Sequence, residues 1–513
     1  MTPHAYTEKA LVEESAEEIL VELGWTPASA DTETFGLAGT LGRDSVRDVV
    51  LAIHLRRALL ALNADAPPVA LDLAVDELTR DRVAMGAAAA NREVYRLVTE
   101  GVKVTFKDPT TGKDTPTTLR VIDWESPERN EFLAIRQLEL KGPLYTCIPD
   151  VVLFVNGLPW VVIELKRPGL PAKQAFDENL TSYKHIQNGV PQLFAHNAFL
   201  VASNGTDSRV GSLTADWERF FEWKRVERED EPRRVSLETL LRGTCDPRRL
   251  LDLVQSFTLF SEHKAGLTKI LGQNHQFLGV NNAIGATLEA RKAGHGRAGV
   301  FWQTQGSGKS FSMVFYAQKI LRVVPGNWTF VVITDRVELD DQIAKTFAAC
   351  GAVEDATKCH AQTGAHLRQL LSENHRYVFT LIHKFRTAEV LCDRRDVIVI
   401  VDEAHRSQYD DMAMNMRAAL PNALFVAFTG TPLIAGEERT REVFGDYVSI
   451  YDFQQSIEDH ATVPLYYENR TPELELINPD PVGATHLESG DLQLDLTRPH
   501  AWGSSAARPA ISA

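Results

Sequence analysis

Short apolar runs alternate with helix-like segments along the second half of this 513-residue chain. The runs occupy residues 300–302, 329–335, 377–382, 396–404 and 422–430. This alternation is typical of a parallel β-sheet that is covered by helices on both faces. The sequence therefore predicts an α/β fold for this half of the chain.

The first half begins with a helical pattern and then changes to a β-like one. Within residues 10–23 the apolar side chains share one helical stripe, and Gly24 supplies a stop signal. The stripe consists of Val12, Ala16, Ile19, Leu20 and Leu23. Residues 117–165 are β-like, most clearly in DVVLFVNGLPWVVIEL at 150–165. A helix followed by strands is therefore expected here.

Two stretches are predicted to connect the halves. Residues 204–235 are polar, with EWKRVEREDEPRR near their end, and indicate a solvated connection. Residues 250–260, LLDLVQSFTLF, indicate a helix. A chain of this length is too long for one core, and no internal repeat is present. We expect an N-terminal α/β domain, a helical connector, a second α/β domain and an irregular, disordered tail, over residues 1–235, 236–265, 266–470 and 471–513.

Composition and charge limit the class of protein. The N-terminus lacks the apolar segment of a signal peptide, and no apolar run approaches ~20 residues, so a cytoplasmic protein without a membrane span is expected. Five scattered cysteines without a CxxC pair indicate neither disulfides nor a zinc site. A formal net charge of −15 argues against a surface that binds polyanions everywhere, but a local basic groove remains compatible with it.

The stretch FWQTQGSGKS, residues 301–310, predicts a phosphate-binding loop between a strand and a helix. The backbone NH groups of such a loop hold phosphates, a lysine reaches the β- and γ-phosphates, and a serine ligates Mg²⁺. These roles fall on Thr304, Gln305, Gly306, Ser307, Gly308, Lys309 and Ser310. Gln303 stands where the usual pattern has glycine, a position that makes no phosphate bond. A Gly-Ser turn with a surface lysine is the alternative interpretation.

The run VIVIVDEAH, residues 397–405, ends an apolar strand in two adjacent carboxylates. Asp402 can hold Mg²⁺ through water, and Glu403 can polarise the attacking water. Thr429 and Thr431 lie after another strand, in FTGTP. The order GSGKS, TDR-x-x-L-D-x-Q, DEAH, FTGTP resembles the first motor domain of superfamily 2 helicases and translocases. That resemblance implies a RecA-like fold and ATP as ligand, and it makes Gln276 the candidate for reading adenine.

A second group of charged residues occurs in IPD at 148–150 and ELK at 164–166. A two-residue Asn-Gly turn would set Asp150 opposite Ile163 and give Glu164 the wrong face. A three-residue Gly-Leu-Pro loop sets Asp150 opposite Lys166, and Glu164 shares that face because strand side chains alternate. We expect the three-residue loop, which makes a hard-cation site with a lysine beside it. An ordinary hairpin with an exposed charged face is the alternative.

This pattern resembles the PD-(D/E)xK nuclease fold. By that resemblance Asp150 and Glu164 bind Mg²⁺, Lys166 orients or activates water, and an upstream helical acid completes the site. Glu13 is the candidate for that acid, with Glu14 as the alternative. A Q-x-x-x-Y helix often follows the lysine, which assigns a supporting role to Tyr183 and leaves Asn179 or Gln174 as its amide partner.

A nuclease followed by a superfamily 2 motor resembles the R subunit of type I restriction enzymes, over about residues 5–470. The resemblance implies a type I site-specific deoxyribonuclease that acts on double-stranded DNA with modification and specificity subunits as partners. Family members continue into a second RecA-like domain, so this chain is expected to be truncated and inactive by itself. Two alternatives are a non-catalytic remnant or interaction module that binds ATP or DNA, and a free-standing repair helicase-nuclease.

Overall fold

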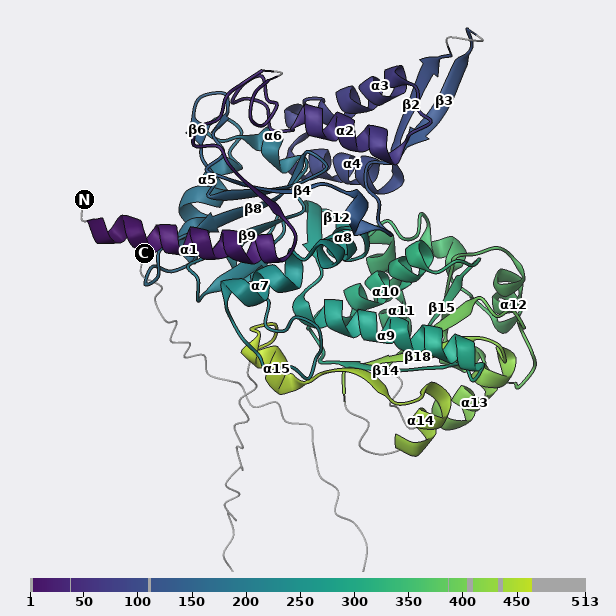
Figure 1. Ribbon diagram of the computed structural model, residues 1–513. Helices are drawn as coiled ribbons and strands as arrows, with labels where there is room; N and C mark the ends of the chain where they lie inside the picture. The colour runs from purple at the N-terminus through teal and green to yellow at the C-terminus, as the bar shows by residue number, and fades with distance from the viewer. Residues whose placement is uncertain are drawn as a thin grey trace, which may run out of the picture. The chain divides into compact units, whose positions relative to one another are not determined.

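Two β-sheets, one in each half of the chain, organise the computed structural model (Figure 1). The structure describes residues 3–36, 38–108, 112–385, 387–403, 409–431 and 437–463. The tail predicted at 471–513 lies outside these residues, as does His405 of the DEAH motif. No helix in the described part of the chain is both long and apolar enough to cross a membrane. All five cysteines are free thiols.

The N-terminal sheet has seven strands in the order β1-β4-β7-β8-β9-β10-β11. Its pairs are antiparallel except for β1–β4 and β8–β9, which are parallel. The strands are β1 Thr26–Ser29, β4 Phe132–Arg136, β7 Val151–Val155, β8 Leu158–Leu165, β9 Phe199–Ser203, β10 Ser208–Gly211 and β11 Phe221–Glu222. Because every residue of β7 and β8 is buried, this hairpin forms the centre of the sheet.

Helices bury both faces of this sheet. Alternate residues of the central strands pack on one face with the helices α1 Pro3–Glu22, α4 Ala87–Glu100, α7 Leu237–Thr244 and α8 Pro247–Ser256. The other face packs against a π-helical turn, Ala175–Leu180, and the short helices α5 Thr181–Tyr183 and α6 Pro191–Phe194. The predicted N-terminal helix is confirmed, with its stripe from Val12 to Leu20 buried and a left-handed Gly24 after its end.

A group of smaller elements extends from the N-terminal sheet. The helices α2 Ala52–Leu62 and α3 Pro68–Thr79 lie beside the hairpin of β2 Val102–Lys107 and β3 Asp114–Leu119 (Figure 1). The short strands β5 Leu140–Lys141 and β6 Thr146–Cys147 pair with each other. They lie directly before Asp150 in the chain, so they lead into the predicted nuclease hairpin.

The second sheet has six parallel strands in the order β16-β15-β17-β18-β14-β19. The strands are β14 Arg297–Gln303, β15 Thr329–Thr334, β16 Tyr377–Leu381, β17 Val397–Asp402, β18 Leu424–Thr429 and β19 Tyr447–Tyr451. The five runs that predicted strands are confirmed, and β19 was missed because it is only partly buried and lacks a continuous apolar run. Since all six strands are parallel, the loops after their carboxyl ends share one edge of the sheet.

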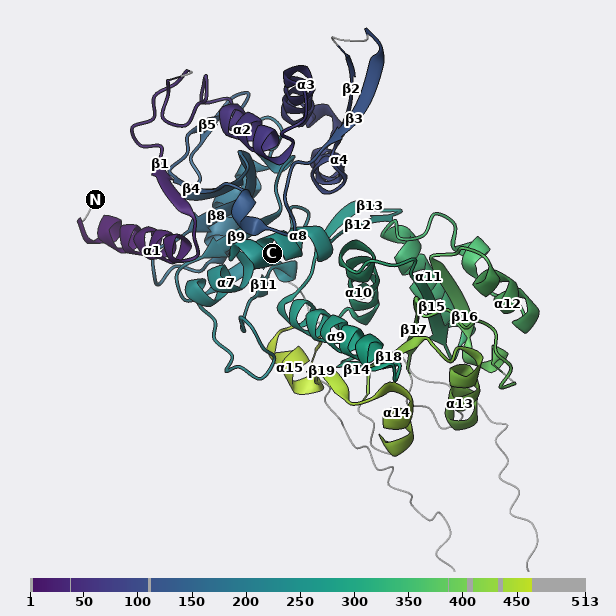
Figure 2. The ribbon, with the colours of Figure 1, turned by 45° about the vertical axis from the view of Figure 1, so that its right-hand side comes forward.

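Helices cover both faces of the second sheet, as the alternation predicted. Phe330 and Val332 of β15 pack in the hydrophobic cluster that also contains buried residues of α9 Asn274–Ala293, α10 Lys309–Val323 and α11 Val337–Ala349. Val331 and Ile333 face the cluster of α12 Gly364–Ser372, α13 Tyr409–Ala419 and α14 Glu437–Phe444. Figure 2 shows α11 and α12 at the end of the sheet where β15 and β16 lie. The α/β prediction for this half is confirmed.

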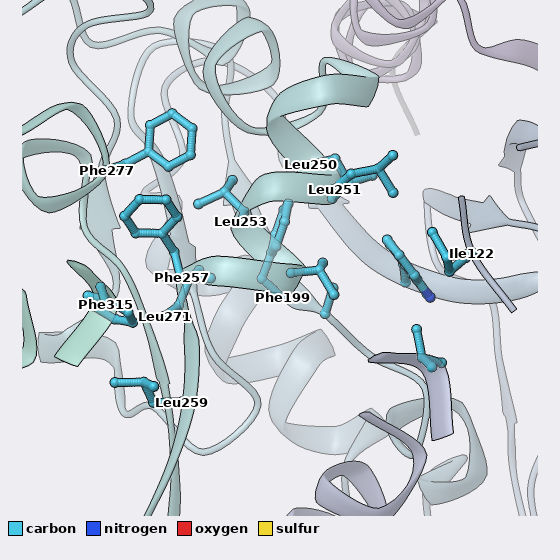
Figure 3. Packing of buried hydrophobic residues seen from close by; sticks show 14 of the residues in the cluster. Ile122, Phe199, Leu250, Leu251, Leu253, Phe257, Leu259, Leu271, Phe277 and Phe315 are labelled. Atoms are coloured by element: carbon cyan, nitrogen blue, oxygen red, sulfur yellow. The ribbon is translucent and has the colours of Figure 1, made fainter. Parts of the chain in front are cut away.

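The connecting segments differ from the prediction. The helix expected through Phe260 ends at Ser256, and the chain continues as strand β12 Thr258–His263, which pairs with β13 Gly266–Leu271. This pairing with a later segment overrides the local helical pattern. Figure 3 shows Leu250, Leu253 and Phe257 of this region within a cluster that also includes Phe199 and Phe277. The hydrophobic core therefore continues through the connector.

The stretch 204–235 is not a solvated connection. It supplies strands β10 and β11, and Trp223 within it is buried. Its charged side chains have partners near residue 459, because Lys224 Nζ lies 2.7 Å from Asp459 Oδ1 and Arg233 also pairs with Asp459. The final helix α15, Phe453–Glu458, ends just before that aspartate.

Candidate functional site

The predicted phosphate loop lies between β14 and α10. The strand ends at Gln303 and the helix begins at Lys309, so residues 304–308 form the turn. Gly306 and Gly308 adopt φ angles of 88° and 92°, a left-handed region that favours glycine. Thr304 and Ser307 are buried, whereas Gln305 and Gly306 are exposed. A helix N-terminus preceded by such a turn presents backbone NH groups to an anion.

Lys309 contacts both carboxylates of the DEAH motif. Its Nζ lies 2.8 Å from Asp402 Oδ1 and also forms an ion pair with Glu403. One strand, β18, separates β14 from β17, and the parallel register brings the ends of both strands to the same edge. Burial raises the pKa of Asp402, while the Lys309 ammonium opposes that rise. The structure thus brings together the lysine and both acids that the motifs predicted.

Glu403 follows β17 in a strained conformation. Its φ of 55° is uncommon for a residue other than glycine, and its backbone NH donates to Phe428 O at 2.9 Å. Such strain is common at functional positions. Gly430 N lies 3.4 Å from Glu403 Oε2, which places the acid beside the FTGTP segment. There Thr429 Oγ1 donates to Thr431 O at 3.0 Å, so the two predicted threonines bond to each other.

Gln276, the expected adenine reader, has its side chain engaged within the protein. Its Nε2 donates to Gly308 O at 3.1 Å, and its Oε1 accepts from Gln273 N at 3.0 Å. The second bond belongs to a capping arrangement at the start of α9. Ser310, the expected magnesium ligand of the loop, is partly exposed in the first turn of α10.

The nuclease hairpin brings Asp150 and Glu164 together, but by another route than the expected three-residue loop. Asn156 and Gly157 form a two-residue turn with φ angles of 51° and 79°, which pairs Val155 with Leu158. A bulge at Trp160 then shifts the register by one, because Leu153 pairs with Val161. Continued outward, that register sets Asp150 across from Glu164.

The local contacts agree with this register. Leu165 N donates to Asp150 Oδ2 at 2.7 Å, and both acids are almost completely buried. The thiol of Cys147 lies close enough that burial and then the charge of Glu164 raise its pKa. Two buried neighbouring carboxylates are hard oxygen donors of the kind that Mg²⁺ and Mn²⁺ prefer, so the donor set fits such a cation.

The π-helical turn supplies the side-chain partners of Lys166, and α5, which follows it, carries Tyr183. Lys166 Nζ donates to Asn179 Oδ1 at 2.8 Å and to Glu178 Oε2 at 3.1 Å. Asn179 Nδ2 donates to Tyr183 OH at 3.1 Å. Burial raises the pKa of Tyr183, and the neighbouring charge of Glu164, which also bonds its hydroxyl, raises it further. Of the two amides left open by the sequence, Asn179 is the one that joins the lysine to the tyrosine.

Glu13 reaches this region through Gln137. Gln137 Nε2 donates to Glu13 Oε2 at 3.1 Å, and Gln137 N donates to Asp150 O at 3.1 Å. Glu14 is exposed on the same helix. No group of three or more His, Cys, Asp or Glu side chains is arranged to hold a metal among the described residues. Glu13 is therefore connected through Gln137 to the backbone of Asp150, and it forms no three-acid metal group with Asp150 and Glu164.

Two polar residues near these sites had no predicted side-chain role. Gln303 was treated as a tolerated replacement for glycine, yet its side chain is fully buried under the loop. Gln137 adopts a φ of 52° beside Asp150. The only feature of the sequence that pointed to a role for Gln303 was its position as a polar residue at the end of an apolar strand. The sequence around Gln137 gave no indication of a role.

Comparison with known proteins gives matches over both halves. A family model described as type I restriction enzyme R protein N terminus matches residues 5–219, and one described as SWI2/SNF2 ATPase matches residues 275–488. The type I restriction enzyme HindI endonuclease subunit of Haemophilus influenzae is 38% identical over 462 residues, which cover 84% of this chain and 43% of that subunit.

Two further matches extend the comparison. The putative type I restriction enzyme MjaIXP endonuclease subunit of Methanocaldococcus jannaschii is 34% identical over 421 residues, 75% of this chain and 39% of that protein. The chain therefore spans less than half the length of these curated relatives. A solved structure of the ATP-dependent Type ISP restriction-modification enzyme LlaBIII bound to DNA matches with a TM-score of 0.28 and 13% identity. It covers 36% of this chain and 15% of that one, and a likeness at that score carries no argument.

Proposed function

The chain belongs to the type I restriction enzyme R-subunit family, and from this premise we propose that it carries an ATP-driven motor part and a DNA-cutting part. In this proposal the second sheet is the first RecA-like lobe of a superfamily 2 motor. The first sheet is a PD-(D/E)xK nuclease. The motor draws in double-stranded DNA, and the nuclease cuts both strands away from the recognition site.

In the motor part, the residues near the carboxyl ends of the parallel strands have distinct roles. Backbone NH groups of residues 304–308 hold the phosphates of ATP, and Lys309 exchanges its contacts with Asp402 and Glu403 for the β- and γ-phosphates. Ser310 and Asp402 would hold Mg²⁺, which neutralises phosphate charge when it is bound. Glu403, freed from Lys309, polarises the attacking water.

Thr429 and Thr431 have a coupling task in this proposal. Gly430, between them, lies next to Glu403, and the two threonines bond to each other after β18. A change of charge around Glu403 on hydrolysis therefore reaches the loop after β18 directly. We therefore assign Thr429 and Thr431 the role of coupling ATP hydrolysis to movement on DNA.

In the nuclease part, Asp150 and Glu164 would hold Mg²⁺, which stabilises charge on the scissile phosphate when it is bound. Lys166 orients or activates the attacking water. Asn179 positions Lys166 and Tyr183 positions Glu164, because each of these pairs is in contact. The Asn179 amide also donates to the Tyr183 hydroxyl, which connects the two pairs. Glu13 supports the site through Gln137.

The observation that carries the proposal is the presence of two lysine and double-carboxylate groups at the edges of two separate sheets. Asp150, Glu164 and Lys166 lie in or directly beside the β7–β8 hairpin of the first sheet, whereas Lys309 begins the helix after β14 of the second sheet and contacts Asp402 at the end of β17. A phosphate loop alone supports ATP binding, and a nuclease hairpin alone supports cleavage. Only the pair fits an enzyme that cuts DNA with ATP as fuel, with modification and specificity subunits supplying methylation and target choice.

A double dissociation with the chain itself tests this division of tasks. Asp150→Asn is expected to remove Mg²⁺-dependent DNA nicking at high protein concentration and to leave affinity for Mg²⁺ and an ATP analogue unchanged. Lys309→Ala is expected to lose nucleotide affinity and to keep nicking. Loss of both properties in either variant would contradict the assignment of two separate sites. Nicking that persists in Asp150→Asn would remove the nuclease assignment.

A further inference from the structure

Gln303 lies at the end of β14, directly before the phosphate loop, and has no task in the function proposed above. Its side chain is fully buried. Gln303 Nε2 donates to Ser307 O at 2.7 Å, and Ser312 Oγ donates to Gln303 Oε1 at 2.8 Å. One carboxamide therefore ties the middle of the loop to the first turn of α10.

His275 supports the same carbonyl from the neighbouring helix. Its Nε2 lies 3.3 Å from Ser307 O and 3.2 Å from Gln303 Nε2. Burial lowers the pKa of His275 to about 4, so the ring is neutral near pH 7. With its hydrogen on Nε2 the ring donates to Ser307 O, and with its hydrogen on Nδ1 it accepts from Gln303 Nε2, so either tautomer ties the ring to this end of the loop.

The end of strand β19 contacts both His275 and the loop. The His275 ring stacks on Tyr451, with ring centroids 3.8 Å apart and planes 8° from parallel. Tyr451 O also accepts from Thr304 N at 2.9 Å and from Thr304 Oγ1 at 3.0 Å. The first residue of the loop and the ring beneath it are therefore both fixed to the end of β19.

Gln276 holds the next carbonyl in the loop. Its Nε2 donates to Gly308 O at 3.1 Å. A Cβ atom at position 308 would lie 2.9 Å from that nitrogen, and Gly308 has a φ of 92°, so glycine suits both the approach and the backbone here. The Gln276 amide, which would have to contact an adenine base in order to read it, therefore already bonds to the loop.

We propose that Gln303, His275 and Gln276 form a loop brace, in which their side chains hold the Ser307 and Gly308 carbonyls and so orient the phosphate-binding NH groups. Gln303, which stands where the usual pattern has glycine, supports the turn through its side chain. In a planar trans peptide the C=O and N–H point in opposite directions. Holding the Ser307 and Gly308 carbonyls inward therefore turns the NH groups of Gly308 and Lys309 outward, toward the phosphates. The inference rests on the proposed nucleotide site, and it makes Gln276 a positioning residue for the loop instead of a reader of adenine.

Restoring the usual glycine gives the sharpest test. Calorimetry would measure the affinity of the full chain for Mg²⁺ with a non-hydrolysable ATP analogue, and a thermal melt would follow the nucleotide-free chain. Gln303→Gly is expected to bind about tenfold more weakly, which corresponds to about 1.4 kcal/mol. Gln303→Met keeps the buried volume, so a comparable loss of affinity with a Tm near that of the parent excludes simple unfolding. Affinity in Gln303→Gly equal to the parent's overturns the brace.

Inorganic tripolyphosphate separates a role on the loop from a role on the base. Gln276→Met is expected to weaken binding of Mg²⁺-tripolyphosphate and of the ATP analogue by the same factor, because only the loop has changed. A loss confined to the ATP analogue would mean that Gln276 reads the base, and it would overturn this part of the inference.

Ser312→Ala removes the far contact of Gln303 and provides a double-mutant cycle. Ser312 Oγ also accepts from Gln276 Nε2 at 3.4 Å, so the brace predicts that Ser312→Ala weakens binding about threefold and that the double variant with Gln303→Met loses less affinity than the two separate losses combined. Independent, additive losses would contradict a shared brace.

Lys309→Ala distinguishes failure of the brace from failure of the nucleotide site. If the parent and Lys309→Ala bind both polyphosphates equally poorly, the proposed nucleotide site is wrong and the inference falls with it. If Lys309→Ala loses binding while Gln303→Gly and Gln303→Met do not, the site stands and the brace alone is overturned.

Discussion

Replacing Lys309 with alanine changes both the stability and the ligand affinity of the motor part, and the structure sets the size of each effect. The Lys309 side chain is 11% exposed, and its partners Asp402 and Glu403 are 5% and 14% exposed. Removing one partner from a buried ion pair costs about 3–5 kcal/mol. Because this group borders the open loop, we expect the lower end, about 3 kcal/mol at pH 8.

The stability loss should depend on pH. Burial already raises the pKa of Asp402, and without the ammonium that pKa rises further above its unfolded value. The folded variant then binds a proton more tightly than the unfolded chain does, so its free energy of unfolding falls as pH rises through the folded-state pKa. The deficit relative to the parent is therefore full at pH 8 and shrinks as the pH is lowered, which urea unfolding at several pH values would measure.

The affinity for nucleotide should fall more than stability alone explains. Charge-assisted hydrogen bonds contribute about 1.5–3 kcal/mol each. Loss of the Lys309 contacts to the β- and γ-phosphates then weakens Mg²⁺ and ATP-analogue binding by about 100-fold or more. Calorimetry on the folded fraction at pH 7 would measure this.

Lys319 provides the matched control on the same helix. Its side chain is 12% exposed, and its Nζ lies 2.5 Å from Asp252 Oδ2, but it is ten residues, or about 15 Å, further along α10. Lys319→Ala is expected to lose similar stability and to bind nucleotide as the parent does. Equal loss of affinity in both variants, or unchanged affinity in Lys309→Ala, would refute the assignment of Lys309.

Four further substitutions test other parts of the account. Glu403→Gln should keep affinity for the ATP analogue within about threefold but stop ATP hydrolysis in the assembled enzyme, because Asp402 remains as metal ligand; turnover equal to the parent's would remove Glu403 from catalysis. Lys166→Ala should reduce DNA cleavage by about 10²–10⁴-fold without changing nucleotide affinity. Tyr183→Phe deletes the hydroxyl between Asn179 and Glu164 and should weaken Mn²⁺ binding about tenfold in calorimetry, whereas an unchanged affinity would make the tyrosine purely structural. Burial raises the pKa of Asp340 to about 6, so the contribution of this carboxyl to the free energy of unfolding should fall as pH rises from about 4 to 6; in urea titrations the difference in stability between the parent and Asp340→Asn should therefore shift in favour of the variant over that range.

The sequence predicted the second sheet well because its strands carry strong local signals. The predicted runs are mostly apolar, and several pass directly into polar residues, as in the change from Val401 to Asp402. In a parallel sheet buried on both faces, such runs need no alternation to be recognised. Since all carboxyl ends meet at one edge, the motif residues Lys309, Asp402 and Glu403 could be placed together from their order alone.

The register of the nuclease hairpin could not be predicted, because its strands too are buried on both faces. Every residue from Leu158 to Leu165 is buried, so no hydrophobic alternation distinguishes one register from the next. The Asn-Gly turn was recognised as an option, but the compensating bulge at Trp160 leaves no mark in the pattern. The sequence therefore predicted that Asp150 and Glu164 lie close together, but the expected loop and the expected pairing of Asp150 with Lys166 were both wrong.

Contacts between residues far apart in sequence account for the remaining errors. The polar run at 204–235 has the composition of a loop, yet Lys224 and Arg233 find their partner at Asp459. The helical pattern that continues past Ser256 gives way to β12 because β13 is available to pair with it. Neither partner is visible within a local window of sequence.

A crystal of the full chain grown with Mn²⁺ and a non-hydrolysable ATP analogue tests the central claim most directly. Anomalous scattering from Mn²⁺ would mark every metal position in one measurement. The account predicts one peak between Asp150 and Glu164 and a second beside Ser310 and Asp402, with the Lys309 ammonium on the analogue's phosphates. Absence of the first peak with the second present would contradict the nuclease part, and analogue bound away from residues 304–310 would contradict the motor part.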